Sequence, residues 1–158
     1  TGKKYDICPY GTEAMHVLRA EKGFIIVGQE TDGTVTPVDL GMDWIISKTK
    51  SDFIGKRALS RRDIVKNDRK QLVGLLTDNK TDILPEGSQI VEEVLPKPPM
   101  PMIGHVTSSY FSPNCDRPIA MAMIKGGRDR MGKTVYIPLK NKTIAATITD
   151  TNFLDGGS

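Results

Sequence analysis

This sequence of 158 residues lacks long apolar runs, paired cysteines and clustered histidines. No run approaches the roughly 20 apolar residues that a membrane-spanning helix needs, so we predict no membrane segment. The two cysteines, Cys8 and Cys115, lie far apart, which argues against a disulfide framework and favours a reducing, cytoplasmic setting. His16 and His105 are equally scattered. We therefore also predict no metal site.

Aromatic residues are scarce where positive charge is concentrated. Nine basic and three acidic residues lie between Lys48 and Lys70, and Phe53 is the one aromatic residue among them. Few aromatic side chains are available there for bases to stack on, so we predict no nucleic-acid partner. Three alternatives stay open for this segment: a solvated helix and linker, which is the commonest case, a site for a polycarboxylate ligand, or a docking surface for an acidic subunit.

The composition is that of a globular protein, with 38% hydrophobic and 26% charged residues. The length suits one ordinary domain, or a small domain and a piece of another. The sequence opens on Thr1 rather than methionine and has no apolar signal core. We therefore expect it to begin inside a longer polypeptide.

Residues 10–29 combine two periodicities. The first half predicts a helix, because apolar residues recur at helical spacing, Glu13 stands in the first turn and Gly23 supplies a left-handed stop. Phe24 to Val27 is an apolar run that predicts a strand covered on both faces. Further along, Phe53, Leu59 and Ile64 indicate a basic amphipathic helix running toward residue 65.

Glu21 is the candidate functional residue of this region. It falls in the last helical turn, where the carbonyl ends disfavour a carboxylate, and at the edge of the apolar face. A basic residue such as Arg19 or Lys22, or a distant one, could satisfy it. Alternatively, the carboxylate could accept hydrogen bonds from a pair of ring N–H groups on a ligand. The pattern alone does not separate these alternatives.

The second part of the chain predicts six short strands. Turn and loop signals rich in proline, glycine and asparagine separate them, and no helical pattern intervenes. Such spacing is typical of a small antiparallel barrel or sandwich. The expected strands cover residues 71–77, 89–94, 103–110, 119–124, 134–139 and 143–149. The polar run at 66–70 divides the chain into residues 1–66 and 71–155.

Several motifs resemble one known superfamily. Leu18-Arg19-Ala20-Glu21-Lys22-Gly23 looks like the Leu-Arg-x-Glu-x-Gly signature of the aminomethyltransferases, or glycine cleavage T-proteins. Gly104-His105-Val106-Thr107-Ser108 is similar to their C-terminal barrel. Within the superfamily, the sequence of residues 10–24 is most similar to the C-terminal region of the α subunits of heterotetrameric sarcosine oxidases. The resemblance implies an α+β fold: the end of a folate-binding domain, followed by a small antiparallel β-barrel.

The resemblance also implies an activity. Enzymes of this kind are oxidoreductases acting on CH–NH donors: they demethylate N-methylglycine at a flavin, and tetrahydrofolate captures the methylene group. The products are glycine, methylenetetrahydrofolate and hydrogen peroxide. FAD, FMN and NAD are expected in the rest of the complex, and the partners are the remaining α-subunit domains, the other subunits and the small-molecule folate. The family's catalytic aspartate would lie upstream of Thr1, so we expect no catalytic residue here and an inactive isolated fragment.

Two residues carry over as candidate folate ligands. Glu21 matches the glutamate that holds the pteridine ring. Lys50 falls where the aminomethyltransferases place an arginine near the benzoyl-glutamate tail, but lysine offers a point charge without bidentate geometry.

Two other functions stay open. One is a stand-alone aminomethyltransferase or folate-dependent demethylase that acts without a flavin partner. The other is a non-catalytic module whose basic segment docks on an acidic subunit surface, which charge reversal at Arg61 and Arg62 would test.

Overall fold

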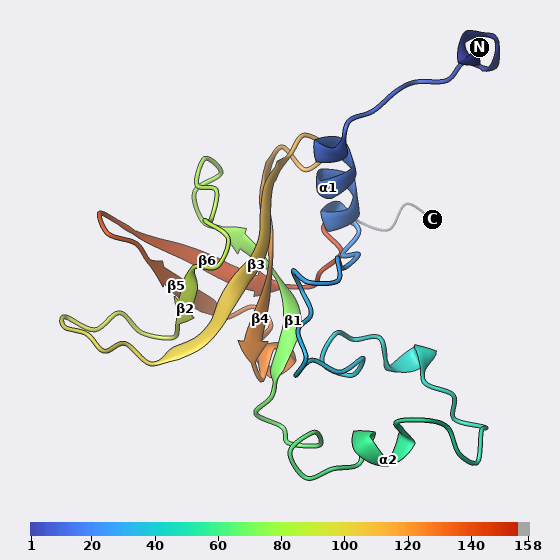
Figure 1. Cartoon of the computed structure of the whole chain (residues 1–158). Helices are drawn as coiled ribbons and strands as arrows, with labels where there is room; N and C mark the ends of the chain where they lie inside the picture. The colour runs from blue at the N-terminus through green and yellow to red at the C-terminus, as the bar shows by residue number, and fades with distance from the viewer. Residues whose placement is uncertain (155–158) are drawn as a thin grey trace.

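A closed six-stranded antiparallel barrel forms the second half of the chain (Figure 1). The computed structural model describes residues 1–154. The strands are β1 (Lys70–Thr77), β2 (Gln89–Val91), β3 (Met102–Ser112), β4 (Arg117–Lys125), β5 (Thr134–Pro138) and β6 (Thr143–Thr149). Their order around the barrel is β1-β4-β3-β2-β5-β6, and β6 closes the ring by pairing with β1. The six predicted strands are confirmed, and the barrel rather than the sandwich forms.

Alternation along the strands fills the barrel interior with aliphatic side chains. The core contains Val73 and Leu75 of β1, Ile90 of β2, Val106 of β3 and Ile148 of β6, all with 1% exposure or less. Because successive strand residues point to opposite faces, every second position supplies this core.

Strand β4 is buried on both faces. Ala120, Ala122 and Ile124 point into the barrel core, whereas Ile119, Met121 and Met123 belong to a second apolar cluster on the outer side. This explains the uninterrupted apolar run from 119 to 124. Gly104 on β3 is required beside it, because a Cβ there would collide with the backbone of Met123.

Part of the first 69 residues lies on the outer face of the barrel, whereas residues 1–10 and the segment around residues 48–66 extend away from it (Figure 1). Helix α1 (Thr12–Glu21) packs against β3 and β4, as Figure 1 shows. Gly23 ends the helix with a φ of +72°, and a Cβ there would lie 2.7 Å from the Thr151 carbonyl oxygen. The helix and its glycine stop are confirmed. The other short elements are η1 (Gly2–Tyr5), η2 (Asp43–Ile45), α2 (Lys56–Leu59) and η3 (Gly127–Arg130).

The predicted strand at 24–27 is wrong. Phe24 is 67% exposed, Val27 is 85% exposed, and the chain turns back so that the Glu30 backbone N–H donates to the Ile26 carbonyl. A strand needs a neighbour for its backbone groups, and no described strand pairs with this run.

The long basic helix is also wrong. Only α2 forms within that segment, and Gly55, with a φ of +94°, precedes it. Phe53, Leu59 and Ile64, the expected apolar face, are only partly buried, and the neighbouring Ile54 and Val65 are exposed, so little packing supports a longer helix.

Candidate functional site

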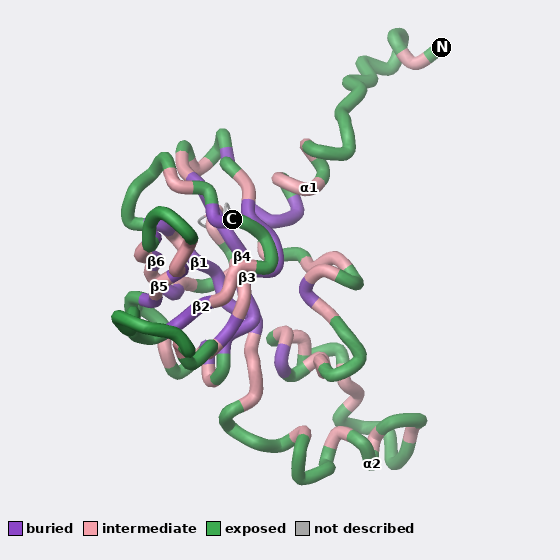
Figure 2. The backbone as a smooth tube through the Cα atoms, turned by 60° about the vertical axis from the view of Figure 1, so that its left-hand side comes forward, coloured by how far each residue is buried: buried purple, intermediate pink, exposed green. Residues whose placement is uncertain are grey.

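Helix α1 buries charged side chains and exposes apolar ones. Arg19 and Glu21 are buried at its C-terminal end, whereas Met15 and Leu18 are about half exposed. Figure 2 shows the burial concentrated where the end of the helix meets the barrel. A buried charge is costly unless it is well paired, so the contacts of these two residues decide what the helix does.

The Glu21 carboxylate is fully buried and accepts hydrogen bonds from two neutral groups. The Ser112 hydroxyl donates to Oε1 at 2.6 Å, and the Asn114 side-chain amide donates to Oε2 at 2.8 Å. Ser112 Oγ also accepts a hydrogen bond from the Cys115 backbone N–H at 2.9 Å. Within residues 1–154, no basic side chain contacts this carboxylate. The structure therefore does not show the alternative in which a basic residue pairs with Glu21.

Arg19 is held by a separate buried network. Its guanidinium forms an ion pair with Glu30 at 3.0 Å and donates to the Ser108 hydroxyl at 2.6 Å. It also donates to the Gln29 side chain at 2.9 Å and lies 5.7 Å from the centre of the Tyr110 ring, a cation–π distance. The Ser108 hydroxyl in turn donates to Glu30. Both terminal nitrogens of Arg19 are engaged here, its buried Nε has no described hydrogen-bond partner, and none of the three contacts Glu21 two residues away.

A bulge in β3 brings the partners of both networks to one face. The register against β4 shifts between Val106 and Ser108, so that Val106 opposes Ala122 and Ser108 opposes Met121. Val106 points into the core, and the shift reverses the alternation, so Ser108, Tyr110 and Ser112 face outward toward α1. The alternation at 106–110 is visible in the sequence, but the bulge that turns it outward is not.

A second polar cluster fastens residues 28–39 to the start of β1. Arg69 binds Asp39 through two nitrogens, with Nε at 2.9 Å from Oδ1 and Nη2 at 2.6 Å from Oδ2. The backbone N–H and hydroxyl of Thr36 also donate to Asp39, each at 2.8 Å. Burial raises the pKa of Asp39, but the hydrogen bonds from Arg69 and Thr36 outweigh it and hold the pKa below its ordinary value. Asp39 is thus an ionised anchor.

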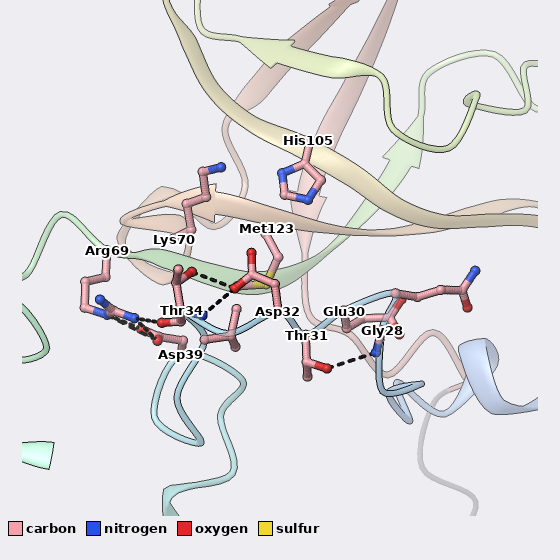
Figure 3. A pocket seen from close by; sticks show the side chains of 12 residues that line it. Gly28, Glu30, Thr31, Asp32, Thr34, Asp39, Arg69, Lys70, His105 and Met123 are labelled. Carbon is pink, nitrogen blue, oxygen red and sulfur yellow. Dashed lines mark hydrogen bonds and ion pairs between the residues drawn. The ribbon is translucent and has the colours of Figure 1, made fainter. Parts of the chain in front are cut away.

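A cavity of about 400 Å³ lies beside this anchor. Figure 3 shows Lys70 and His105 projecting from the barrel over Asp32 of the loop. Burial lowers the pKa of His105, the positive charge of Lys70 lowers it further, and Asp32 opposes them. His105 is therefore biased toward its neutral form.

Lys50, the second candidate ligand, lies in a different place. It is exposed and lines an apolar cavity of about 430 Å³ with Phe53 and Ile54. Its backbone N–H donates to the Ser47 hydroxyl, and its carbonyl accepts from the Lys56 ammonium group at 2.8 Å. Glu21 does not line this cavity, so the two candidates are not brought together around one described cavity.

Residues 1–154 contain neither a candidate membrane-spanning helix nor a candidate metal-binding cluster. No helix there has the length and apolar character needed to cross a membrane. No group of three or more histidine, cysteine, aspartate or glutamate side chains is arranged to hold a metal ion.

Comparisons with known proteins identify relatives along the chain. The sarcosine oxidase α subunits of Corynebacterium sp. strains P-1 and U-96 are 49% and 48% identical over 156 residues, which cover 98% of this chain and 16% of each relative. The aminomethyltransferase of Clostridium botulinum is 31% identical over 153 residues, which cover 96% of this chain and 39% of that protein. The chain thus spans about a sixth of the length of the first relatives.

A solved structure supports the fold. The glycine cleavage system aminomethyltransferase T from Bartonella henselae superimposes with a TM-score of 0.74 at 24% identity, covering 89% of this chain and 38% of that one. A family model for the GCVT N-terminal domain matches residues 1–50. A second, for the glycine cleavage T-protein C-terminal barrel domain, matches residues 70–155, which is more than half of the chain. The chain therefore belongs to the glycine cleavage T-protein family, of which it carries the C-terminal barrel domain.

Proposed function

We propose that this chain is the C-terminal part of a sarcosine oxidase α subunit. Its role is to contribute one wall of the site where tetrahydrofolate captures the methylene group released from sarcosine. The similarity to sarcosine oxidase α subunits, at 48–49% identity against 31% for the aminomethyltransferase, supports this choice over a stand-alone aminomethyltransferase.

The observation that carries the folate role is the Glu21 carboxylate, which is fully buried and held by neutral donors alone. An ionised carboxylate has about four acceptor positions, and the two described donors leave the others for a ligand. A pteridine ring offers a pair of N–H donors along one edge, which matches the two oxygens of a carboxylate. Glu21 would hold that ring, and Lys50 would meet the negative charge of the glutamate tail.

The flavin and nicotinamide chemistry belongs to other parts of the complex in this proposal. The remaining α-subunit domains and the other subunits are the protein partners, and reduced folate is the small-molecule partner. We expect the isolated chain to be inactive and to bind folate weakly at best, because the rest of the site lies in those domains. Tight folate binding by the isolated chain would show that residues 1–158 hold the complete site.

Replacement of Glu21 tests the folate role directly. In the complete enzyme, Glu21→Gln keeps the shape but removes the charge, so we expect at least about 10-fold weaker binding of reduced folate. Flavin-dependent sarcosine oxidation, measured as hydrogen peroxide formation, should be largely kept. Unchanged folate affinity would count against the assignment.

Subunit docking is a second candidate role, favoured by the exposure of the basic segment. Arg61 and Arg62 are exposed, and the ion pair between Arg61 and Asp63 is 3.3 Å long and open to solvent. Charge reversal of both arginines should leave folding intact, because exposed pairs contribute little to stability. Loss of subunit assembly in that variant would support docking, and normal assembly would exclude these two residues from an interface.

A further inference from the structure

The two donors that hold Glu21 differ in how firmly they are fixed. Ser112 ends β3 and Asn114 lies in the turn to β4, at the end of the barrel that meets α1. Ser112 is fully buried, whereas Asn114 is exposed in the turn. The same carboxylate therefore has one rigid and one accessible partner.

Ser112 is locked in orientation as well as in position. Its oxygen accepts the Cys115 backbone N–H at 2.9 Å, so the hydroxyl proton is directed to Glu21 Oε1 at 2.6 Å. A hydroxyl group has one proton to give, and Glu21 Oε1 is its one acceptor among the described residues. Ser112 thus fixes both the place and the rotation of the carboxylate.

Asn114 has no comparable restraint. Its amide makes one side-chain hydrogen bond among the described residues, to Glu21 Oε2 at 2.8 Å. It also lines a cavity of about 400 Å³ together with Asn152, Phe153 and Leu154. An amide N–H is a neutral planar donor of the same kind as the N–H groups on a pteridine edge.

We propose that Ser112 is a positioning residue for Glu21 and that Asn114 is a displaceable partner, whose place on Oε2 the ligand takes. This rests on the proposed folate role of Glu21. Ser112 can stay in place when the ligand binds, because Oε1 has two lone pairs and accepts both the hydroxyl and a ring N–H. Asn114 must leave, since its amide already donates to Oε2 at the position that the ligand would take.

The proposal predicts opposite effects for the two side chains. In the complete enzyme, with 5-formyltetrahydrofolate as the probe, Ser112→Ala should weaken binding about 10-fold, because the carboxylate loses a directed charge-assisted hydrogen bond. Asn114→Ala should leave the affinity unchanged or increase it up to about 10-fold, since the ligand no longer displaces a partner.

Two matched sets separate these roles from a change in folding. Ser112→Thr and Ser112→Val have the same shape and differ in the hydroxyl, so binding should be stronger in Ser112→Thr. Ser109→Ala removes a buried hydroxyl of the same strand that has no described hydrogen-bond partner, and it should change nothing in folate binding. Thermal unfolding of each variant identifies any loss of structure.

The outcomes distinguish this inference from the proposed function. If Glu21→Gln weakens folate binding while Ser112→Ala does not, or while Ser112→Thr and Ser112→Val bind equally, the positioning role is overturned and the folate role stands. If Asn114→Ala weakens binding as much as Ser112→Ala, both donors position Glu21 and the displacement is overturned. If Glu21→Gln has no effect either, the folate role itself fails.

Discussion

The barrel and the segment that precedes it bury different chemistry. In the barrel, the largest fully buried side chains are aliphatic or methionine, such as Leu75, Ile90 and Met121. In residues 1–69 the largest fully buried side chains are the two carboxylates of Glu21 and Glu30. The barrel is stabilised mainly by its apolar interior, whereas the preceding segment is fastened by directed polar contacts.

The same contrast appears at the surface. Of the eighteen large apolar side chains that are exposed among the described residues, twelve lie in residues 1–69. Figure 2 shows this segment mostly exposed or intermediate, to one side of the buried strands of the barrel. Ile54, Val27 and Trp44 are the most exposed. Exposed apolar groups on this scale are typical of a surface that meets other protein, which agrees with the proposed contact with further α-subunit domains.

The largest expected effect comes from removing Arg19, which binds Glu30 in its own segment and Ser108 in the barrel. Arg19→Ala leaves the buried Glu30 carboxylate without its cation, which should cost about 3–5 kcal/mol in the docking of the segment. Hydrogen exchange should then show faster exchange of the α1 amides, with the β4 amides still protected.

A double variant serves as the control for the Arg19 replacement. Arg19→Met combined with Glu30→Met removes both charges and should recover much of the loss, because no buried charge is left unpaired. Equal acceleration of exchange in α1 and β4 would contradict the comparison, since the two regions would then unfold as one unit.

A matched pair of isoleucines measures the contrast in apolar burial. Ile90 in β2 is fully buried, and Ile54 is fully exposed. Ile90→Ala should reduce the free energy of unfolding by about 2–5 kcal/mol through the lost burial and the resulting cavity. Ile54→Ala should change it by less than about 0.5 kcal/mol. Denaturant unfolding checks both values, and a comparable loss in the two variants would mean that Ile54 packs against another surface in solution.

The two regions also differ in what the sequence could reveal. The barrel strands follow from local alternation and turn residues, so positions 71–77 and 143–149 are found from pattern alone. Helix α1 and its stop at Gly23 are equally local. The run at 24–27 has the composition of a strand, but strand formation depends on a neighbour elsewhere in space, which composition does not contain.

The candidate site was only partly predictable for a related reason. The sequence singles out Glu21 by its unfavourable position at the helix end, and the structure shows that it is buried. Its partner Ser112 lies 91 residues away, and Arg19 meets Ser108 across 89 residues. Those contacts depend on the β3 bulge, which reverses the alternation without a clear sequence signal. The assignment of Glu21 and Lys50 to folate stays a prediction.

A smaller effect should come from the anchor at Asp39. Its pKa is held below the ordinary value of 3.8, so the ionised form contributes stability that is present above about pH 3.8. That contribution is lost as the pH falls through the lowered pKa. Asp39→Asn should cost about 1.5–3 kcal/mol near neutral pH, through the weakened hydrogen bonds to Arg69 and Thr36. Urea unfolding measures the difference in the free energy of unfolding between wild type and Asp39→Asn. This difference should decrease in acid, and a difference that does not change with pH would exclude this linkage.

The smallest expected effect tests how the loop and the barrel share the cavity at His105. Burial and the charge of Lys70 lower the pKa of His105, and Asp32 opposes them. Lys70→Met should therefore raise that pKa, and Asp32→Asn should lower it further. Each shift should correspond to an interaction free energy of less than about 1 kcal/mol, because the groups are partly solvated. Since the folded pKa lies below the ordinary value, neutral His105 favours the folded state above about pH 6.5, and this contribution is lost as the pH falls. An NMR titration of the imidazole measures both shifts. If Asp32→Asn left the pKa unchanged, the loop at 28–39 would not lie against His105 in solution, and the contact between the two regions would be confined to α1 and the Asp39 anchor.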